Sequence, residues 1–427
     1  MTRKMNSGVA RKNTGLMLSA LGLLVACGVL YAGPLDPPAG PIVSTGKTLI
    51  EVEPRIAINA TNTPGDADSQ FKITQRGSYY LTGNMTGVAG KHGIEIAASG
   101  VTLDLNGFDL VGVAGMGAFD GVSVTASGQV NITVRDGSIR GWGADGIDLA
   151  TSGASNSTIE NIRASGNLGV GISIGTTSRV SNCVATGNNG IGIRLLEGSV
   201  VAGCAATGNG ATGIAAGNRC SISACSSTGN TGDGISADGS AILNCSSNDN
   251  TGAGIAAISD SSIVGCSVSD NTGHGITVSF GCTLVSCTAR LNSGNGISAT
   301  SGSSITGCTA TGNRLVGIRV GGECHVINNA CSVNGNGGDG ANIHVTSTDN
   351  RIEGNSCTGA DRGVDVDAAG NIIVRNTCSG NTINWDIVAN NYYGPIVDRT
   401  GVVAAAVTGS SAASTLGSAD ANANFSY

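Results

Sequence analysis

The dipeptide Gly-Ile recurs through the middle of the chain at an almost constant interval. Neighbouring copies are 21 residues apart, except for one pair that is 20 residues apart. An apolar position that returns with a fixed period of this length is typical of a solenoid, in which each repeat forms one coil and stacks on the next. Looser copies on both sides extend the count to about 14 coils, a stack roughly 60–65 Å long at the spacing of neighbouring strands. The regular copies are Gly171-Ile172, Gly192-Ile193, Gly213-Ile214, Gly234-Ile235, Gly254-Ile255, Gly275-Ile276, Gly296-Ile297 and Gly317-Ile318. The looser ones are marked by Ile94, Val122, Ile147, Ile343, Val364 and Ile387.

The composition supports a solenoid and argues against a globular core. The chain has 69 glycines, and only 12% of its residues are charged and 3% aromatic. Each coil of a solenoid needs only a few small inward side chains to stack on its neighbours. Disorder is the competing interpretation of a chain rich in glycine and small polar residues. The fixed interval between apolar residues argues against disorder.

A second apolar position lies 13 residues before each regular isoleucine, so every coil contains at least two short strands. Apolar and polar residues alternate after the isoleucine, as in Ile318-Arg319-Val320, which is the period of a half-buried strand. The glycine before each isoleucine permits a tight bend. Asparagine recurs at one turn, because it tolerates the left-handed conformation and its stacked amides can hydrogen-bond from coil to coil. This predicted ladder contains Asn188, Asn209, Asn230, Asn250, Asn271, Asn292 and Asn313.

Segments near the start of the repeat resemble a known family. Residues 71–81 (FKITQRGSYYL), 93–96 (GIEI) and 101–107 (VTLDLNG) are similar to the opening coils of pectate-lyase-like right-handed β-helix proteins. The similarity covers roughly residues 70–390. It implies an all-β fold, a right-handed parallel β-helix with a repeat of about 21 residues. It implies no single activity, because that superfamily includes lyases, hydrolases, epimerases and adhesins.

The N-terminus has the composition of an export signal, in which basic residues precede an apolar run that is short for a membrane span. Cleavage after Ala32 is the expected processing, although LVAC at 24–27 also resembles a lipobox that would leave a lipidated Cys27. We therefore expect an exported protein, extracellular or in the cell envelope, with no transmembrane span in its mature chain. The expected organisation is a signal peptide at 1–32, a linker or cap at 33–69, the β-helix at 70–390 and a C-terminal cap or tail at 391–427.

The chain is acidic, with a formal net charge of −7 at pH 7. Loss of the basic N-terminal segment would make the mature chain more acidic. This charge argues against nucleic acid and anionic membranes as partners, because binding to their dense negative charge relies on a broad cationic surface. Glycans or other cell-surface components are the expected partners, and the sequence carries no signal for an oligomeric state.

Seven cysteines recur with the coil, and two interpretations of this column compete. An exported chain with 14 cysteines invites disulfides. However, stacked positions lie about 4.8 Å apart, whereas a disulfide needs Cβ atoms about 3.8 Å apart. Zinc needs four ligands that converge, which a linear column cannot supply. We expect reduced, buried cysteines that pack as small apolar side chains. The column contains Cys183, Cys204, Cys225, Cys245, Cys266, Cys287 and Cys308.

The resemblance also implies where chemistry would lie if the protein were an enzyme. Active members of the superfamily act on acidic polysaccharide along an exposed sheet, with Arg or Lys as base, clustered Asp for Ca²⁺ and aromatic platforms for sugars. The middle of this chain is poor in these groups, since no lysine follows Lys91. His274 faintly resembles a polygalacturonase element, but other coils carry unrelated residues at its position.

The late coils are richer in charge. The position after the second-strand apolar residue holds Arg319, His344 and Asp365 in consecutive coils, so these side chains should form one outward column. They are the candidate catalytic residues, and Asp365, Asp367 and Asp361 are the candidate Ca²⁺ ligands. The alternative is a set of solvated charges that pair with one another, and we favour this structural interpretation.

Three functions fit the sequence. The first is a non-catalytic surface or secreted solenoid for recognition or structure, for which glycans are the candidate ligand. The second is a polysaccharide lyase or epimerase that acts on uronic-acid-containing glycans through the late column. The third is a self-assembling component of the cell envelope. We favour the first and expect no cofactor, with Ca²⁺ required only if the protein is an enzyme.

Overall fold

The computed structural model describes residues 53–335, 340–400 and 419–427. Residues Pro54–Tyr427 form one structural unit. The predicted signal peptide, both cleavage sites and Cys27 lie outside the described residues. In the described part of the chain, no helix is long and apolar enough to cross a membrane.

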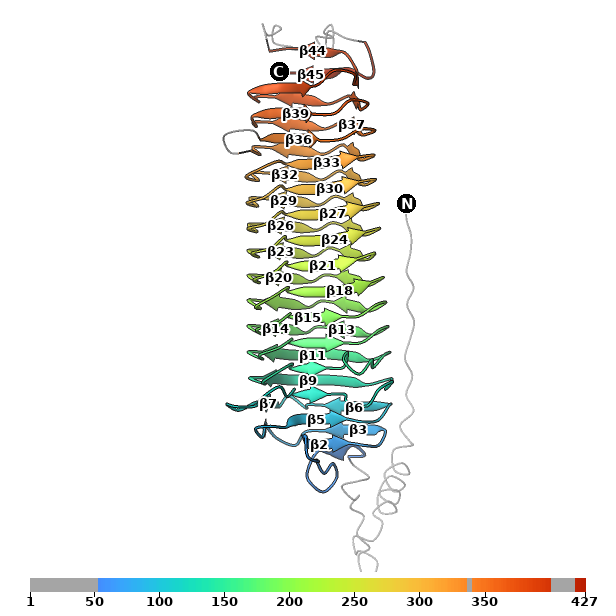
Figure 1. Cartoon of the computed structure of the whole chain (residues 1–427), viewed down its shortest axis with the longest axis vertical. Coiled ribbons are helices and arrows are strands. Elements are labelled where there is room, and N and C mark those ends of the chain that lie inside the picture. Colours follow the sequence, from blue (N-terminus) through green and yellow to red (C-terminus); the bar gives the residue numbers. More distant parts are fainter. Residues whose placement is uncertain (1–52, 336–339, 401–418) are drawn as a thin grey trace, which may run out of the picture. The chain divides into compact units, whose positions relative to one another are not determined.

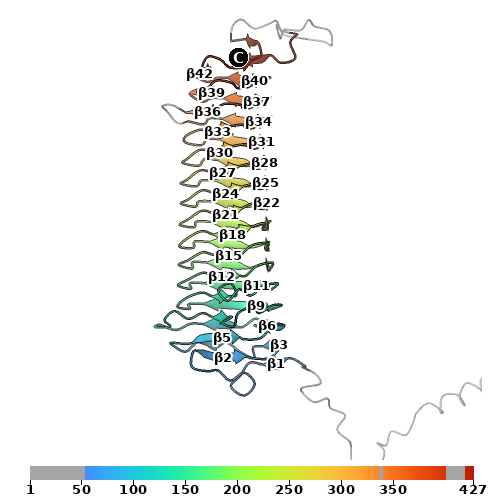
Figure 2. The ribbon, with the colours of Figure 1, turned by 45° about the vertical axis from the view of Figure 1, so that its right-hand side comes forward.

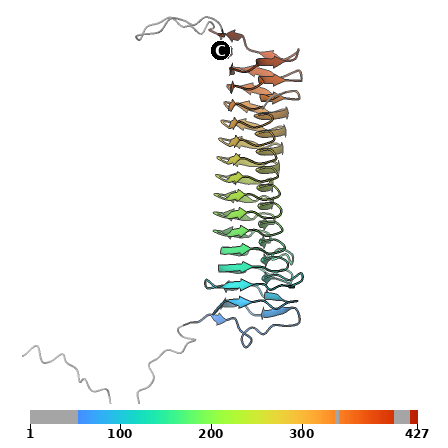
Figure 3. The same cartoon turned by 90° about the vertical axis from the view of Figure 1, so that its left-hand side faces the viewer.

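The unit is a stack of coils that follow one another in chain order (Figure 1). A regular coil contains three short strands, such as β24 (Ile255–Ser259), β25 (Ser262–Val264) and β26 (Ser267–Ser269). The first strand of each coil joins a 15-stranded sheet, and the other two join a 30-stranded sheet. Both sheets are parallel from coil to coil, and Figures 2 and 3 show them as two faces of the stack.

The strands of the 15-stranded sheet are the ones that carry the candidate site. They are β2 (Ser69–Ile73), β5 (His92–Ile96), β8 (Val122–Ser123), β10 (Ile147–Asp148), β12 (Ile172–Ile174), β15 (Ile193–Leu195), β18 (Ile214–Asn218), β21 (Ile235–Asp238), β24 (Ile255–Ser259), β27 (Ile276–Phe280), β30 (Ile297–Ser301), β33 (Ile318–Gly322), β36 (Ala341–Val345), β39 (Arg362–Val366) and β42 (Ile383–Ile387).

The regular isoleucines form one inward column. Each is paired in register with the isoleucine of the next coil, as Ile255 is with Ile276, and none is exposed to solvent. The second apolar position forms a matching column in the 30-stranded sheet, in which Ile242 pairs with Ile263. The predicted parallel solenoid is therefore confirmed. The core is a thin stack of β-branched side chains, because two inward columns from opposite sheets meet along its length.

The solenoid has slightly more coils than the sequence indicated. The 15-stranded sheet contains a strand that the count of about 14 coils missed, namely β2 at its N-terminal edge. In β2, Phe71 pairs with Ile94 and Ile73 pairs with Ile96. This coil has no Gly-Ile dipeptide, because a large aromatic residue occupies the isoleucine position, and the repeat pattern therefore overlooked it.

The asparagines of the predicted ladder stack at the turn that precedes the 15-stranded sheet, and they are buried. The side-chain oxygen of Asn250 accepts the backbone N–H of Asn230 at 3.0 Å. The amide group of Asn250 donates to Asn271 Oδ1 at 3.0 Å and to the carbonyl of Ser227 at 3.2 Å. Each asparagine thus satisfies backbone groups that the bend removes from the sheets, which would be costly to leave unpaired.

The cysteine column occupies a second ladder of the same kind. The thirteen described cysteines are buried and form no disulfide. Cys287 N–H approaches Cys308 Sγ at 3.4 Å, and the Cys287 thiol donates to the Val285 carbonyl at 3.4 Å. In the next coil Asn329 takes over the position and accepts Cys308 N–H at 2.8 Å. These cysteines belong to the hydrophobic core. The position also forms hydrogen bonds, since the amide of Asn329 takes the place of a thiol there.

Candidate functional site

The residue that follows each inward position of the 15-stranded sheet points away from the core, and these residues lie in register from one end of the sheet to the other. We call this set the outer column. Its members in chain order are Lys72, Glu95, Ser123, Asp148, Ser173, Arg194, Ala215, Ser236, Ala256, Thr277, Ser298, Arg319, His344, Asp365 and Asp386.

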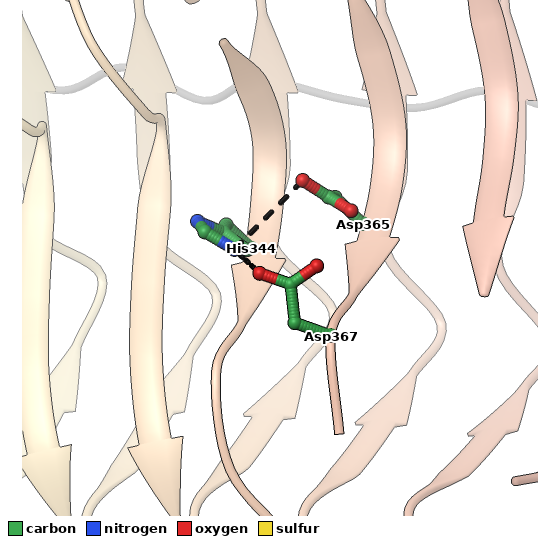
Figure 4. Close-up of side chains that lie close together, drawn as sticks. All are labelled: His344, Asp365 and Asp367. Atoms are coloured by element: carbon green, nitrogen blue, oxygen red, sulfur yellow. Dashed lines mark hydrogen bonds and ion pairs between the residues drawn. The ribbon is translucent and has the colours of Figure 1, made fainter. Parts of the chain in front are cut away.

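The C-terminal part of the outer column brings three of the predicted residues together. His344 lies on β36, Asp365 lies on the adjacent β39, and Asp367 directly follows β39. His344 Nε2 is 2.8 Å from Asp367 Oδ2 and 3.8 Å from Asp365 Oδ2. Figure 4 shows both carboxylates directed at the same edge of the imidazole. We call these three residues the late cluster.

Burial differs strongly within the late cluster. The Asp367 side chain is 59% exposed, whereas that of Asp365 is 7% exposed and that of His344 is 21% exposed. The prediction that Asp365 faces solvent is therefore wrong, because its side chain is nearly buried. Burial raises the pKa of Asp365, while the charges of His344 and Arg362 act in the opposite direction.

Arg362 and Asp386 add a second pair of charges beside the late cluster. Arg362 Nε lies 2.8 Å from Asp386 Oδ2, and its NH1 lies 3.7 Å from Asp365 Oδ2. The pairing follows from register, since Arg362 begins β39 and Asp386 follows Asp365 in the outer column of β42.

The other two predicted residues lie apart from the late cluster. Asp361 is not among the residues whose ligand atoms lie within 4.8 Å of one another there. Its carboxylate accepts the backbone N–H of Gly340 at 3.3 Å. Arg319 pairs in register with His344. Burial lowers the pKa of His274, and the positive charge of Arg319 lowers it further.

His274 has a structural role. Its Nδ1 accepts the backbone N–H of Asn295 at 2.9 Å, and the Asn295 side chain in turn accepts the N–H of Val316 at 3.1 Å. Asp145 does the same for Val170 at 2.7 Å. At this turn, a coil that carries such an acceptor uses it to hold a backbone N–H of the next coil. Coils with Ile191, Ala253 or Val316 at the same position have no side-chain acceptor there.

A further charged cluster lies at the N-terminal end of the same face and was not predicted. Asp66, Asp68 and Glu95 bring their carboxylates within 4.8 Å of one another. Lys72 Nζ lies between two of them, 2.7 Å from Asp66 and 2.9 Å from Glu95. These hydrogen bonds raise the pKa of Lys72 and lower that of Asp66. The cluster therefore already contains its cation. Glu95 occupies the outer column, so extending that column toward the N-terminus would have found it.

The middle of the outer column is uncharged, and its side chains are short. Five consecutive coils present only small side chains, and an arginine bounds them at each end. Arg194 donates to Ser173 Oγ at 3.0 Å. Phe280, at the end of β27, is 57% exposed. The strip contains Ala215, Ser236, Ala256, Thr277 and Ser298 between Arg194 and Arg319.

The architecture agrees with a known family. A family model described as a right-handed β-helix region matches residues 73–223, 180–306 and 259–413, which overlap and together span most of the chain. The chain belongs to the right-handed β-helix family. No curated protein matches this β-helix protein.

Several solved structures are similar to this β-helix protein. The A-module of Azotobacter vinelandii mannuronan C-5 epimerase AlgE4 has a TM-score of 0.48 and 15% identity, over 75% of this chain and 91% of that chain. The periplasmic alginate epimerase AlgG has a TM-score of 0.34 and 12% identity, over 67% and 78%. The Dettilon tailspike protein has a TM-score of 0.33 and 15% identity, over 73% and 58%. At these identities the likeness concerns the fold alone.

Proposed function

We propose that this protein is an exported, non-catalytic recognition module that binds an extended acidic glycan along the outer face of the 15-stranded sheet. The observation that carries the proposal is the neutral strip of the outer column. Five coils in register present alanine, serine or threonine, and Arg194 and Arg319 bound them. Its location outside the cytoplasm is part of the proposal and rests on the composition of residues 1–32.

The strip suits a long, flat ligand for steric reasons. Arg194 and Arg319 are six coils apart, which corresponds to roughly 29 Å at the spacing of parallel strands. Small side chains allow a polymer to approach the sheet closely, and the hydroxyls of Ser236, Thr277 and Ser298 offer hydrogen-bond donors and acceptors. The guanidinium groups at both ends match carboxylate or sulfate groups on the ligand, because arginine binds such planar or multidentate anions through two N–H groups.

The pairing of side chains in and beside the late cluster is compatible with a non-catalytic interpretation. The imidazole of His344 lies 2.8 Å from Asp367, and Arg362 lies 2.8 Å from Asp386. These contacts account for the four side chains without a substrate, as expected for paired groups on a polar face.

A glycan-binding assay with matched variants tests the proposal. Arg319→Gln, Arg194→Gln and the double variant should each weaken binding of an acidic oligosaccharide, with the largest loss in the double variant. Ala256→Trp should block binding, since a large ring would stand in the middle of the strip. Arg290→Gln is the control, because Arg290 is an exposed arginine of β29 (Thr288–Arg290) in the 30-stranded sheet. Equal binding by the wild type, Ala256→Trp and the double variant would contradict the proposal.

A uronate lyase or epimerase is the second candidate, and the in-register stacking of Arg319, His344 and Asp365 favours it. Such an enzyme removes the C5 proton of a uronate, and Arg319 or His344 would act as the base. The wild type and Asp365→Ala should be compared on pectate and alginate. We expect neither ultraviolet-absorbing unsaturated products nor a change in the uronate configuration. Turnover that the wild type shows and Asp365→Ala loses would replace the recognition proposal by this one.

A further inference from the structure

We infer that His344, Asp365 and Asp367 form a binding site for one divalent metal ion of the zinc and manganese type. The inference does not depend on glycan binding. The three residues come from two adjacent coils, and their ligand atoms lie within 4.8 Å of one another. Figure 4 shows the two carboxylates and the Nε2 edge of the imidazole converging on one small region.

The separations between ligand atoms fit a metal polyhedron. Bonds of about 2.1 Å from a metal to nitrogen and oxygen place neighbouring ligand atoms roughly 3.0–3.4 Å apart in octahedral or tetrahedral geometry. His344 Nε2 is 2.8 Å from one carboxylate oxygen and 3.8 Å from the other. These two distances lie on either side of the 3.0–3.4 Å range. Small side-chain rotations that move the ligand atoms by a few tenths of an ångström would therefore bring them into place. The backbone of both strands is already fixed by the register of β36 and β39.

The donor set determines the class of metal. One imidazole nitrogen and two carboxylates suit zinc, manganese and related first-row divalent ions. Calcium prefers six to eight oxygen ligands and does not favour imidazole. The sequence pointed to calcium because it grouped Asp365 and Asp367 with Asp361. The structure replaces Asp361 with His344 in the cluster, and this replacement changes the expected ion.

The burial of Asp365 is an independent observation that points to a bound cation. Its side chain is 7% exposed, and its contacts with His344 and Arg362 measure 3.8 and 3.7 Å. Both contacts are ion pairs, and both are longer than a hydrogen bond. They offset part of the cost of burying a carboxylate, and a cation at shorter range would offset more of it. A metal ion at about 2 Å would provide that compensation.

The charges in and around the late cluster are compatible with a bound divalent ion. As metal ligands, two carboxylates balance the charge of one divalent ion, and an imidazole ligand adds no charge. Arg362 is the nearest competing cation, but its closer partner is Asp386 at 2.8 Å. The cluster of Asp66, Asp68 and Glu95 provides a contrast, because Lys72 lies within 3 Å of two of its carboxylates and fills the cation position. The two clusters share a face of the solenoid and differ in this respect.

Metal titration of the purified protein tests the site. Zn²⁺ and Mn²⁺ should each bind with one strong site per chain and raise the melting temperature, and Ca²⁺ should bind at least tenfold more weakly. His344→Gln, Asp365→Asn and Asp367→Asn should each weaken Zn²⁺ binding at least tenfold. Nitrogen coupling in the electron spin echo of bound Mn²⁺ should be present in the wild type and absent in His344→Gln.

Control variants separate this site from other histidines and carboxylates. His325→Gln removes an exposed histidine of β34 (His325–Ile327) in the other sheet, and Asp66→Asn alters the cluster that contains Lys72. Both should bind Zn²⁺ like the wild type. If Asp365→Asn does not fold, Asp367→Asn carries the test, because Asp367 is 59% exposed. Wild-type Zn²⁺ affinity in both His344→Gln and Asp367→Asn would overturn the inference, as would Ca²⁺ binding as tight as Zn²⁺ binding.

Discussion

One turn position shows how several residue types perform the same task in this solenoid. Before the strands of the 15-stranded sheet, side-chain acceptors of Asp145, Asp233, His274 and Asn295 each receive a backbone N–H of the following coil. These four side chains share the same hydrogen-bond geometry, but they differ in charge. Carboxylate and imidazole acceptors titrate, whereas the amide does not. The pH dependence of stability should therefore differ from coil to coil.

Asp145→Asn should stabilise the protein at neutral pH. Burial raises the pKa of Asp145 to about 6, above the value of about 3.9 in an unfolded chain. The folded state therefore holds a proton that the unfolded state releases, and stability at this position falls as pH rises from about 4 to about 6. The amide keeps the acceptor for Val170 N–H without a charge. We expect a gain in unfolding free energy on the order of 1–2 kcal/mol at pH 7 and none near pH 4. Urea denaturation at both pH values measures it, and equal gains would contradict the explanation.

His274→Asn should change stability only on the acid side. Burial, assisted by the charge of Arg319, lowers the pKa of His274. A histidine of the unfolded chain titrates near 6.5, so the stability that neutral His274 provides is present above that pH and is lost as pH falls below it. Protonated Nδ1 cannot accept the N–H of Asn295. The variant should match the wild type at pH 8 and melt higher at pH 5. A higher melting temperature for the wild type at pH 5 would contradict this assignment.

Among the structural elements, the turns determine how the strands are held. Strands of three to five residues provide few hydrogen bonds of their own, and ladders of buried side chains satisfy the backbone at each bend. The ladder through Cys287 and Cys308 continues through Asn329 without a change of position. A thiol is a weak donor and a weak acceptor, so an amide in the same place makes stronger hydrogen bonds.

Cys308→Asn should therefore be tolerated or stabilising, and Cys308→Val should destabilise. Cys308 is 1% exposed and directly precedes Asn329 in its ladder, so a new amide could donate to Asn329 Oδ1, which now accepts only a backbone group from this coil. Valine removes both the donor and the acceptor, which costs about 1–3 kcal/mol for buried groups. Thermal unfolding of both variants at pH 7 measures the difference. If valine is the more stable, the position is an apolar slot and the hydrogen-bonding interpretation is wrong.

The sequence predicts the coils far better than the late cluster, and the reason is physical. The inward position of Ile255 could be predicted, because Ile235 and Ile276 lie one coil before and one coil after it. The outer column of Arg319, His344 and Asp365 follows from the same period. The burial of Asp365 and the approach of Asp367 to His344 depend on side-chain rotamers and neighbouring charges. The repeat contains no information about these, since each occurs only once in the chain.

At the scale of the whole molecule, each coil contacts mainly the coils before and after it. The strand pairings join β24 to β21 and β27, and no strand of the 15-stranded sheet pairs with a distant coil. Stability in such a solenoid is approximately a sum over coils and their interfaces. A single regular coil should then be removable, provided that every ladder and column keeps its register.

Deleting residues 277–297 removes one coil of 21 residues and joins Ile276 to Ser298. The new neighbours match in type, because Cys266 meets Cys308 and Asn271 meets Asn313. We expect a folded protein with one cooperative transition, a melting temperature lowered by only a few degrees and a length reduced by about 4.8 Å in small-angle scattering. Deleting residues 277–287, about half a coil, is the control. It places turn residues where inward ones are needed, so it should aggregate or unfold. If the half-coil deletion is as stable as the full one, stability does not depend on the register of the ladders, and the account of the fold from its repeat is wrong.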